Sequence, residues 1–290
     1  MTSVIGIDIG GTKIAAARFS GDPLVNEEEI KIDTNASNGF DNVVTEIKKI
    51  IDTLKTDDTA GIGIGVPGLV QTGTGRILKM PNIPGSDNIS LIDLLSDSTD
   101  LPITVDNDAN CFALAEALEG VGKGHKIMIG ITMGTGVGGG IVINEKLFHG
   151  HTGYAGEFGH MLLRPGQVPY KEAIESHIRG EVEQFLSGTA MGKRCVDASN
   201  PDEYLQGEVC EFMHPEIYKE ITWLCTNLIH TLDPSVIVFG GSAGRALGPH
   251  LSKIETELKN WLLPGTPVPV LKIAELKDAA VRGAALLTQV

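Results

Sequence analysis

Val4-Ile5-Gly6-Ile7-Asp8-Ile9-Gly10-Gly11-Thr12-Lys13 is the stretch that decides the fold. A short apolar run ends at Asp8, a glycine pair follows, and Ile14 to Phe19 has the pattern of a returning strand. Glycine lets backbone N–H groups approach a phosphate with no Cβ in the way, and the Thr12 hydroxyl adds a donor. The stretch predicts a strand and a turn suited to phosphate, although one such turn alone is more often a hairpin that binds nothing.

The same pattern returns later in the chain. Ile127 to Met133 predicts a strand, Gly134-Thr135-Gly136 a turn, and Gly138 to Ile143 a returning strand. A third glycine turn, Gly240-Gly241-Ser242, follows the apolar run Val236 to Phe239. Three such turns are harder to explain as plain hairpins, and the weak internal repeat indicates two lobes built on one plan.

Strands alternate with helices along the rest of the chain. This alternation predicts an α/β protein with mainly parallel sheets and with ligands at the strand ends. We place the lobe boundary near Glu119 to Lys123, which gives a smaller lobe over 1–119 and a larger one over 120–278. A closing helix over about 279–290 returns to the first lobe in this interpretation. Further predicted elements are a strand over 28–34, helices over 43–54, 109–118, 215–232, 254–262 and 279–288, and strands over 60–66, 103–106 and 268–273.

The composition narrows the class of protein. The 290 residues carry 23 basic and 37 acidic side chains, a formal charge of −14, which disfavours nucleic acid as a partner. The N-terminus has no basic and apolar leader, and the uncharged run 127–144 is broken by six glycines, so we expect neither a signal peptide nor a membrane span. Four cysteines, Cys111, Cys195, Cys210 and Cys225, form no CxxC pair. They predict reduced thiols and a cytoplasmic location.

Polar residues follow two of the predicted strands. Asp8 ends the first strand, where a carboxylate can hold Mg²⁺ directly or through water, or simply cap the turn. Lys13 either neutralises phosphate charge or is a solvated strand residue. Asp106-Asn107-Asp108-Ala109-Asn110 stands at a strand-to-helix junction. Phosphoryl transfer to an alcohol uses an Asp near the attacking oxygen, and Asn107 can both donate to and accept from a sugar hydroxyl. A helix N-cap cluster explains this segment equally well.

A second polar group lies in a predicted loop, Gly156-Glu157-Phe158-Gly159-His160, with Glu183 further on. Carboxylates and an imidazole suit the hydroxyl-rich rim of a sugar. Alone, His160 is more often a packed structural histidine, and the spacing is not that of metal ligands.

Together these segments resemble the ROK family of bacterial sugar kinases and repressors. The motifs that carry the resemblance are DIGGTK at 8–13, GVPG at 65–68, DNDAN at 106–110, GTGVGGG at 134–140, GEFGH at 156–160, ExxxSG at 183–188 and DPSVIVFGG at 233–241. The resemblance implies a two-lobed actin-like (ribonuclease H-like) ATPase fold with a central cleft, within the hexokinase–actin–chaperone group.

The resemblance also implies roles for matching residues. Asp108 is the catalytic base that takes the proton from the 6-hydroxyl of a hexose. The implied sugar-binding residues are Asn107, Asp108, Glu157, His160 and Glu183, with Gly68 and Asn82 as weaker candidates. The implied ATP-binding residues are Asp8, Gly10, Gly11, Thr12, Lys13, Gly134, Thr135, Gly136, Gly240 and Gly241. ATP and Mg²⁺ are the implied cofactors, and a homodimer is the implied assembly.

One feature departs from the family. Many members have a cysteine cluster between the histidine and the later glutamate, which binds a structural zinc together with that histidine. Met161 to Val182 contains no cysteine, so we predict no zinc. His177 or Glu175 would be the substitutes, but their spacing matches no zinc pattern. The segment Pro165 to Gly180 must then be ordered by packing or by a partner subunit.

The expected function is an ATP-dependent hexose kinase, with glucose as the first substrate. N-acetylglucosamine is the close alternative, and fructose or N-acetylmannosamine follow. Two other classes stay open: a non-catalytic sugar sensor, and a filament-forming or chaperone-like ATPase. The chain opens directly on its first strand, so we expect no winged helix-turn-helix of the kind that the family's repressors carry.

Overall fold

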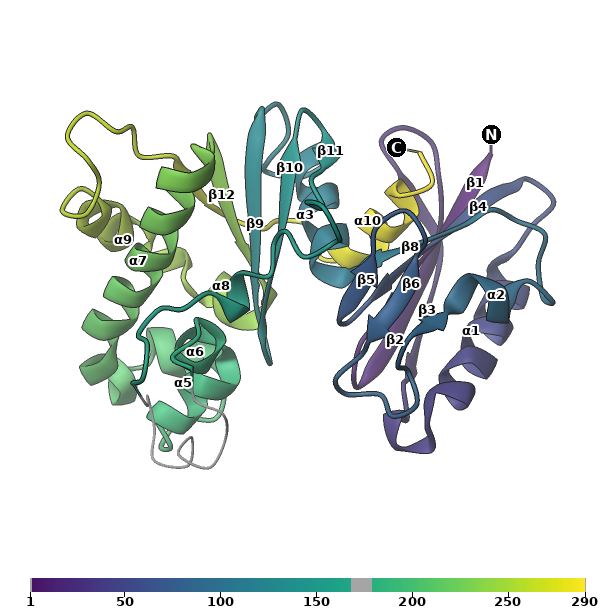
Figure 1. Cartoon of the computed structure of the whole chain (residues 1–290), viewed down its shortest axis with the longest axis horizontal. Helices are drawn as coiled ribbons and strands as arrows, with labels where there is room; N and C mark the ends of the chain where they lie inside the picture. Colours follow the sequence, from purple (N-terminus) through teal and green to yellow (C-terminus); the bar gives the residue numbers. More distant parts are fainter. Residues whose placement is uncertain (1, 168–178, 290) are drawn as a thin grey trace. The chain divides into compact units, whose positions relative to one another are not determined.

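The computed structural model describes residues 2–167 and 179–289, so His177 and Glu175 lie outside the described residues. The chain folds into two compact units (Figure 1). The first unit comprises Met1–Glu119, Glu145–Ala155 and Leu276–Val290. The second comprises Gly120–Asn144 and Gly156–Glu275. The short segment Glu145–Ala155 therefore belongs with the first unit although both of its neighbours in sequence belong with the second.

A five-stranded sheet of order β3-β2-β1-β4-β8 forms the first unit. Strands β1 and β2 are antiparallel, whereas β1, β4 and β8 run parallel to one another. A small antiparallel sheet of order β5-β6-β7 accompanies it. The strands of these two sheets are β1 (Ser3–Ile9), β2 (Lys13–Ser20), β3 (Val25–Asp33), β4 (Thr59–Val66), β5 (Leu69–Gln71), β6 (Arg76–Lys79), β7 (Ile89–Ser90) and β8 (Ile103–Asn107). The two-residue strand β11 (Lys146–Leu147) belongs to neither of them and lies in the segment Glu145–Ala155.

The α-helices of this unit are α1 (Phe40–Leu54), α2 (Leu91–Leu95), α3 (Asp108–Leu118) and α10 (Ala279–Leu286), with a 3₁₀ turn η1 (Ala36–Asn38). Helix α1 buries its apolar stripe, including Val43, Ile47 and Ile51, on the sheet. Helix α10 packs against β1, β4 and α3, and its yellow ribbon lies beside the purple and blue strands in Figure 1. The C-terminal helix therefore completes the core of the first unit.

In the second unit the sheet strands run in the order β10-β9-β12-β13. Strands β9 and β10 form an antiparallel hairpin, and β12 lies parallel to both β9 and β13. The strands are β9 (Ile127–Met133), β10 (Val137–Ile143), β12 (Val236–Gly240) and β13 (Val270–Ile273). The helices are α4 (Glu183–Leu186), α5 (Gly188–Arg194), α6 (Pro201–Gln206), α7 (His214–Leu232), α8 (Gly241–Ala246) and α9 (Leu251–Leu258), with 3₁₀ turns η2 (Phe158–His160), η4 (Glu208–Met213) and η5 (Gly248–His250).

Most of the predicted elements are confirmed, including the strand–turn–strand pattern that begins each sheet. The third glycine segment follows its apolar strand, as predicted, and leads directly into a helix. Strand β12 ends at Gly240, and Gly241, at a φ of 74°, already begins helix α8. A Cβ on Gly241 would lie 2.4 Å from the Met133 carbonyl oxygen, so glycine is required there by close packing against β9.

The prediction of four reduced thiols is wrong, because Cys195 and Cys210 form a disulfide. Cys111 and Cys225 are buried and free. The disulfide connects the residue that ends α5 to η4. The argument for a reducing compartment rested on four free thiols, so it loses that support.

Removing this bond should destabilise the protein. For Cys195→Ala in non-reducing buffer we expect the free energy of unfolding to fall by about 3 kcal/mol, the scale for a closed loop of this length, since the two cysteines are separated by 15 residues. Denaturant unfolding measures the loss, and added reductant should bring the wild type down to the variant. If Cys195→Ala and the wild type had the same free energy of unfolding in non-reducing buffer, the disulfide would not be present in solution.

Across residues 2–167 and 179–289, every helix is too short or too polar to cross a bilayer.

Candidate functional site

Strands β1, β4 and β8 are adjacent and parallel, so their carboxyl ends lie side by side. Two of these ends, those of β1 and β8, carry an acidic residue. In the strand register Asp8 of β1 pairs with Gly65 of β4, and Gly65 pairs with Asp106 of β8. Strands in a sheet are about 4.8 Å apart, so the backbones of Asp8 and Asp106 are separated by roughly 10 Å. Helix α3, which begins at Asp108, starts at the same edge. The carboxyl ends of these strands therefore form an acidic row.

Gly65 keeps the middle of this row open. A Cβ at this position would lie 3.2 Å from Cys111 Sγ, 3.6 Å from the Asp108 Cα and 3.6 Å from Asp8 Oδ1. Burial, and secondarily the charge of Asp108, raise the pKa of Asp8 to about 7. The carboxylates of Asp8 and Asp108 are therefore close enough to repel each other, and a divalent cation bound between them would relieve that repulsion.

The donor set fits magnesium. Proteins hold Mg²⁺ with one or two carboxylates while substrate phosphates and water supply the other ligands. In the part of the chain that the structure describes, no group of three or more histidine, cysteine or acidic side chains is placed to hold a metal ion. A site built on Asp8 needs only this carboxylate from the protein, because phosphates and water would supply the other ligands.

The raised pKa of Asp8 predicts a pH-dependent stability. Between pH 3.8 and about 7 the folded chain keeps the Asp8 proton while the unfolded chain loses it, so this group's contribution to stability falls as the pH rises. In metal-free buffer we expect Asp8→Asn to be more stable than the wild type at pH 8, with a smaller difference at pH 5. Urea unfolding at both pH values checks this, with the exposed Asp52→Asn as the control for a change in net charge. A gain that is no larger at pH 8 would contradict it.

The junction of β8 and α3 positions the predicted base. Asn107 is the N-cap: its Oδ1 accepts from the N–H groups of Ala109 and Asn110 at 2.8 and 3.2 Å. Its Nδ2 donates to the Gly68 carbonyl at 3.0 Å. The capping role weighed from the sequence is thus confirmed for Asn107. Asp108 is instead the first residue of the helix and is partly exposed, and its Oδ1 accepts from the Ala109 N–H at 2.8 Å.

The first glycine turn is confirmed, and it is tight. The Gly10 N–H donates to the Lys13 carbonyl at 2.8 Å, and the Thr34 hydroxyl donates to the Gly10 carbonyl at 2.7 Å. Thr12 and Lys13 are exposed. A Cβ on Gly11 would lie 3.4 Å from the Asn82 Cβ. Asn82, a weak candidate for the sugar, therefore lies against the turn expected to bind phosphate.

In the second unit, helix α5 supports the other glycine turn. The Gly188 N–H donates to the Gly134 carbonyl at 2.7 Å, and the Thr189 hydroxyl donates to the Thr135 carbonyl at 2.8 Å. Gly241 packs on Met133, the residue before the turn. The structure thus brings together the predicted phosphate residues 134–136 and the predicted adenosine residues 240 and 241.

Glu183 also contacts this turn. Its Oε2 accepts from the Val137 N–H at 2.9 Å, and a Cβ on Gly136 would lie 2.4 Å from the same oxygen. The sequence interpretation gave Glu183 to the sugar alone. One of its oxygens also ties α4 to the end of the Gly134–Gly136 turn, which explains why position 136 is glycine.

Glu157 and His160 lie near Glu183 in the same unit. Burial raises the pKa of Glu157; the nearby His160 opposes this shift and the charge of Glu183 adds to it. His160 is largely exposed, and its Nδ1 lies 3.2 Å from Glu181 Oε2. The three predicted sugar residues of this unit therefore interact electrostatically, with Glu181 as a fourth member that the motifs do not indicate.

The GTGVGGG and GEFGH motifs pack closely against each other, and glycines in both make this possible. A Cβ on Gly139 would lie 2.1 Å from the Phe158 ring, and one on Gly159 would lie 2.2 Å from the Val137 carbonyl oxygen. Phe158 is buried on β10 in this way. The glycine-rich strand and the GEFGH segment therefore owe several glycines to packing, which holds Glu157 and His160 against β10.

Backbone pairing holds the two chain segments that flank the region without the cysteine cluster. The backbone of Leu163 and Arg164 pairs with Gly180 across a short antiparallel contact. The Arg164 guanidinium stacks over Phe185 and Trp223 at 5.6 and 4.8 Å and pairs with acidic side chains of α7. Packing and ion pairs therefore hold Arg164, just before the segment 165–180, and backbone bonds hold Gly180 at its end. Residues 168–178 lie outside the described part of the chain.

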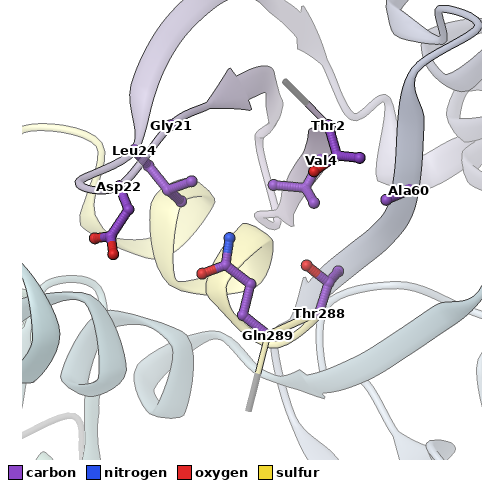
Figure 2. Close-up of a pocket in the computed structure, with 8 residues that line it drawn as sticks. All are labelled: Thr2, Val4, Gly21, Asp22, Leu24, Ala60, Thr288 and Gln289. Atoms are coloured by element: carbon purple, nitrogen blue, oxygen red, sulfur yellow. The ribbon is translucent and has the colours of Figure 1, made fainter.

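A cavity elsewhere in the first unit plays no part in this arrangement. Its volume is about 430 Å³. Figure 2 shows that Thr2, Val4 of β1, and Thr288 and Gln289 after α10 are among the residues that line it. Val4 and Asp8 are separated by four residues of strand, about 13 Å, so the cavity lies at the opposite end of β1 from the acidic row.

The motifs miss several residues that hold the site. Thr189, Glu181 and Arg164 act through contacts between elements far apart in sequence, which no local pattern signals. Only Thr189 had an indication, since it directly follows the ExxxSG motif.

Comparison with known proteins identifies the family. The ROK family model matches residues 4–290. A glucokinase of Halalkalibacterium halodurans is 32% identical over 90% of this chain and 86% of its own length. An N-acetyl-D-glucosamine kinase of Escherichia coli O157:H7 is 33% identical over 97% and 98%. The crystal structure of a ROK family glucokinase from Streptomyces griseus in complex with glucose and AMPPNP is 30% identical, with a TM-score of 0.76 over 99% of both chains.

These matches confirm the predicted actin-like ATPase fold and the predicted resemblance. They extend over almost the full sequence and include two relatives above 30% identity, so the chain belongs to the ROK family.

Proposed function

We propose that the protein is an ATP-dependent hexose kinase that transfers the γ-phosphate to the 6-hydroxyl of its sugar. The observation that carries this proposal is the place of Asp108. Its carboxylate stands at the first residue of α3, at the sheet edge where Asp8 and the Gly10–Lys13 turn also lie. A base, a metal ligand and a phosphate-binding turn at one edge are what phosphoryl transfer to an alcohol needs.

In the proposed reaction Asp108 accepts the proton of the attacking hydroxyl. Its place in the first helical turn favours the negative charge that a base requires. Asn107 contributes to orienting the hydroxyl, because its own side chain is fixed by the Gly68 carbonyl and by the two N–H groups that it caps. Positioning supplies much of the rate when both groups are held rigidly.

The two glycine turns are proposed to bind the phosphates. Backbone N–H groups of Gly10–Thr12 and Gly134–Gly136 serve as donors, with Lys13 neutralising charge and Gly240 and Gly241 lying by the adenosine. When bound with ATP, magnesium neutralises phosphate charge, and Asp8 is the residue proposed to hold it directly or through water. The similarity to the Streptomyces griseus glucokinase, whose structure contains AMPPNP, supports ATP as the phosphate donor.

Glu157, His160 and Glu183 are proposed to bind sugar hydroxyls, with Gly68 and Asn82 in minor roles. Glucose stays the first candidate and N-acetylglucosamine the alternative, since relatives with each name are 32% and 33% identical. Fructose and N-acetylmannosamine follow. Burial raises the pKa of Glu157, and its carboxylate oxygens can accept hydrogen bonds from sugar hydroxyls.

We further propose lobes over 1–119 and 120–278 with the closing helix 279–290 returning to the first, and a homodimer in the cytoplasm, where ATP is supplied. Light scattering of the purified protein tests the dimer. A sugar sensor without activity would need neither the Asp108 carboxylate nor the glycine turns. Glu157 and His160 in the second unit have no evident use in a filament-forming ATPase.

A panel of hexoses and amino sugars tests the proposal. ADP release is coupled to a spectroscopic readout, and kcat/KM is compared for glucose, N-acetylglucosamine, fructose and N-acetylmannosamine. We expect ADP release to depend on the sugar, with one sugar preferred. ATP hydrolysis that is independent of all sugars would favour a different ATPase, and sugar binding with no ADP release would favour a sensor.

A further inference from the structure

The Asp106 carboxylate has no role in the proposed chemistry, yet it is buried and held by three donors. Its Oδ1 accepts from the Asn107 N–H at 2.7 Å and from Asn110 Nδ2 at 2.8 Å. Its Oδ2 lies 2.6 Å from His149 Nε2. Two of these donors belong to Asn107 and Asn110, which are one and two positions away from Asp108 in the sequence. The carboxylate is therefore the fixed point of the β8–α3 junction.

His149 reaches this point from a distant part of the sequence. It lies in the segment Glu145–Ala155, which belongs with the first unit. The Ala155 N–H donates to the His149 carbonyl at 3.2 Å and closes the segment on itself. The hydrogen bond to Asp106 raises the pKa of the imidazole, with burial opposing the shift. Because an ionised carboxylate only accepts, His149 donates from Nε2.

We propose that His149 is a positioning residue for phosphoryl transfer, acting through Asp106 on the orientation of Asn107 and Asp108. This inference rests on the proposed kinase function. Loss of the imidazole leaves the buried Asp106 Oδ2 without this donor, which is energetically costly. We expect the carboxylate to rotate so that Oδ2 accepts from another group. Its bonds to Asn107 and Asn110 change with it, and a displaced base lowers the rate although the sugar and ATP still bind.

The expected effect falls on turnover. For His149→Leu we expect kcat to fall about 10- to 100-fold, the range seen when a partner behind an active group is lost. KM for the sugar and for ATP should stay within about twofold. His149→Gln should recover most of the turnover, because its Nε2 can still donate to Asp106. His151→Leu, two residues along and exposed, is the matched control and should behave as the wild type.

A double-mutant cycle with Asp106→Asn isolates the pair. If His149 acts through Asp106, His149→Leu should lower kcat much less in the Asp106→Asn background than in the wild type. Equal losses in both backgrounds, a wild-type kcat in His149→Leu, an effect confined to KM, or no rescue by Gln would each overturn the inference. Thermal melts of all variants separate a rate effect from loss of fold.

Backbone amide NMR of the full chain gives a second readout that needs no activity. In His149→Leu the amides of Asn107, Asp108 and Asn110 should shift, and in His151→Leu they should not. If the wild type phosphorylates no sugar, the proposed function fails, and these amides alone decide whether His149 sets the junction. Unshifted amides in His149→Leu would overturn the inference in either case.

Discussion

Asp108→Asn is expected to lower kcat by at least about a hundredfold while leaving sugar affinity within a few-fold. The variant keeps the size and the hydrogen-bonding outline of the side chain but removes the base, and general-base contributions are about 10²–10⁴-fold. Because Asn107 remains the helix cap, the fold of the β8–α3 junction should survive. Steady-state ADP release gives kcat, and calorimetry gives the affinity for the sugar.

Asp93→Asn is the matched control, because Asp93 is an exposed acidic residue in the first turn of another helix, α2. It loses the same charge near a helix N-terminus and should leave kcat unchanged. Wild-type turnover in Asp108→Asn would remove Asp108 from the role of base, and an equal loss in Asp93→Asn would point to a general charge effect.

Gly63→Ala is expected to destabilise the first unit by about 3 kcal/mol or more, at the upper end of overpacking effects. A Cβ there would lie 1.7 Å from the carbonyl oxygen of Ala284, in α10. The obstacle is helix backbone, which no side-chain rotation can clear, so α10 or β4 must move. Urea unfolding measures the loss.

Gly61→Ala provides the control on the same face of β4. Its Cβ would meet the Thr288 side chain at 3.4 Å, an ordinary contact. We expect a change within about 1 kcal/mol, since Ala in place of Gly also reduces the freedom of the unfolded chain. If both variants unfold at the same denaturant concentration as the wild type, α10 does not pack on β4 in this way.

The sequence pattern predicts those features of the site that are formed by residues close together in the sequence. Apolar runs of strand length give β1 and β9, and the glycine pairs after them give the turns. Asn107 is recognisable as a cap because it stands between a strand and a helical pattern. These features need only the period of the strand, the period of the helix and the preferences of the turn residues.

Contacts between distant segments leave no such signal. Nothing in Glu145–Ala155 indicates that His149 reaches Asp106, or that Cys195 pairs with Cys210. The motif that contains Glu183 is recognisable, but its bond to the Val137 N–H follows from how α4 packs. These pairings are set by the three-dimensional course of the chain, which one sequence does not disclose.

The chemical identity of the product tests the kinase proposal most directly. The preferred sugar from the panel and ATP are incubated with the protein, and phosphorus NMR identifies where the phosphate is attached. We predict one phosphate on the 6-oxygen, formed in step with ADP, and none from the matching 6-deoxy sugar. Equal ADP release with the 6-deoxy sugar, or ADP without any sugar phosphate, would contradict the proposed function.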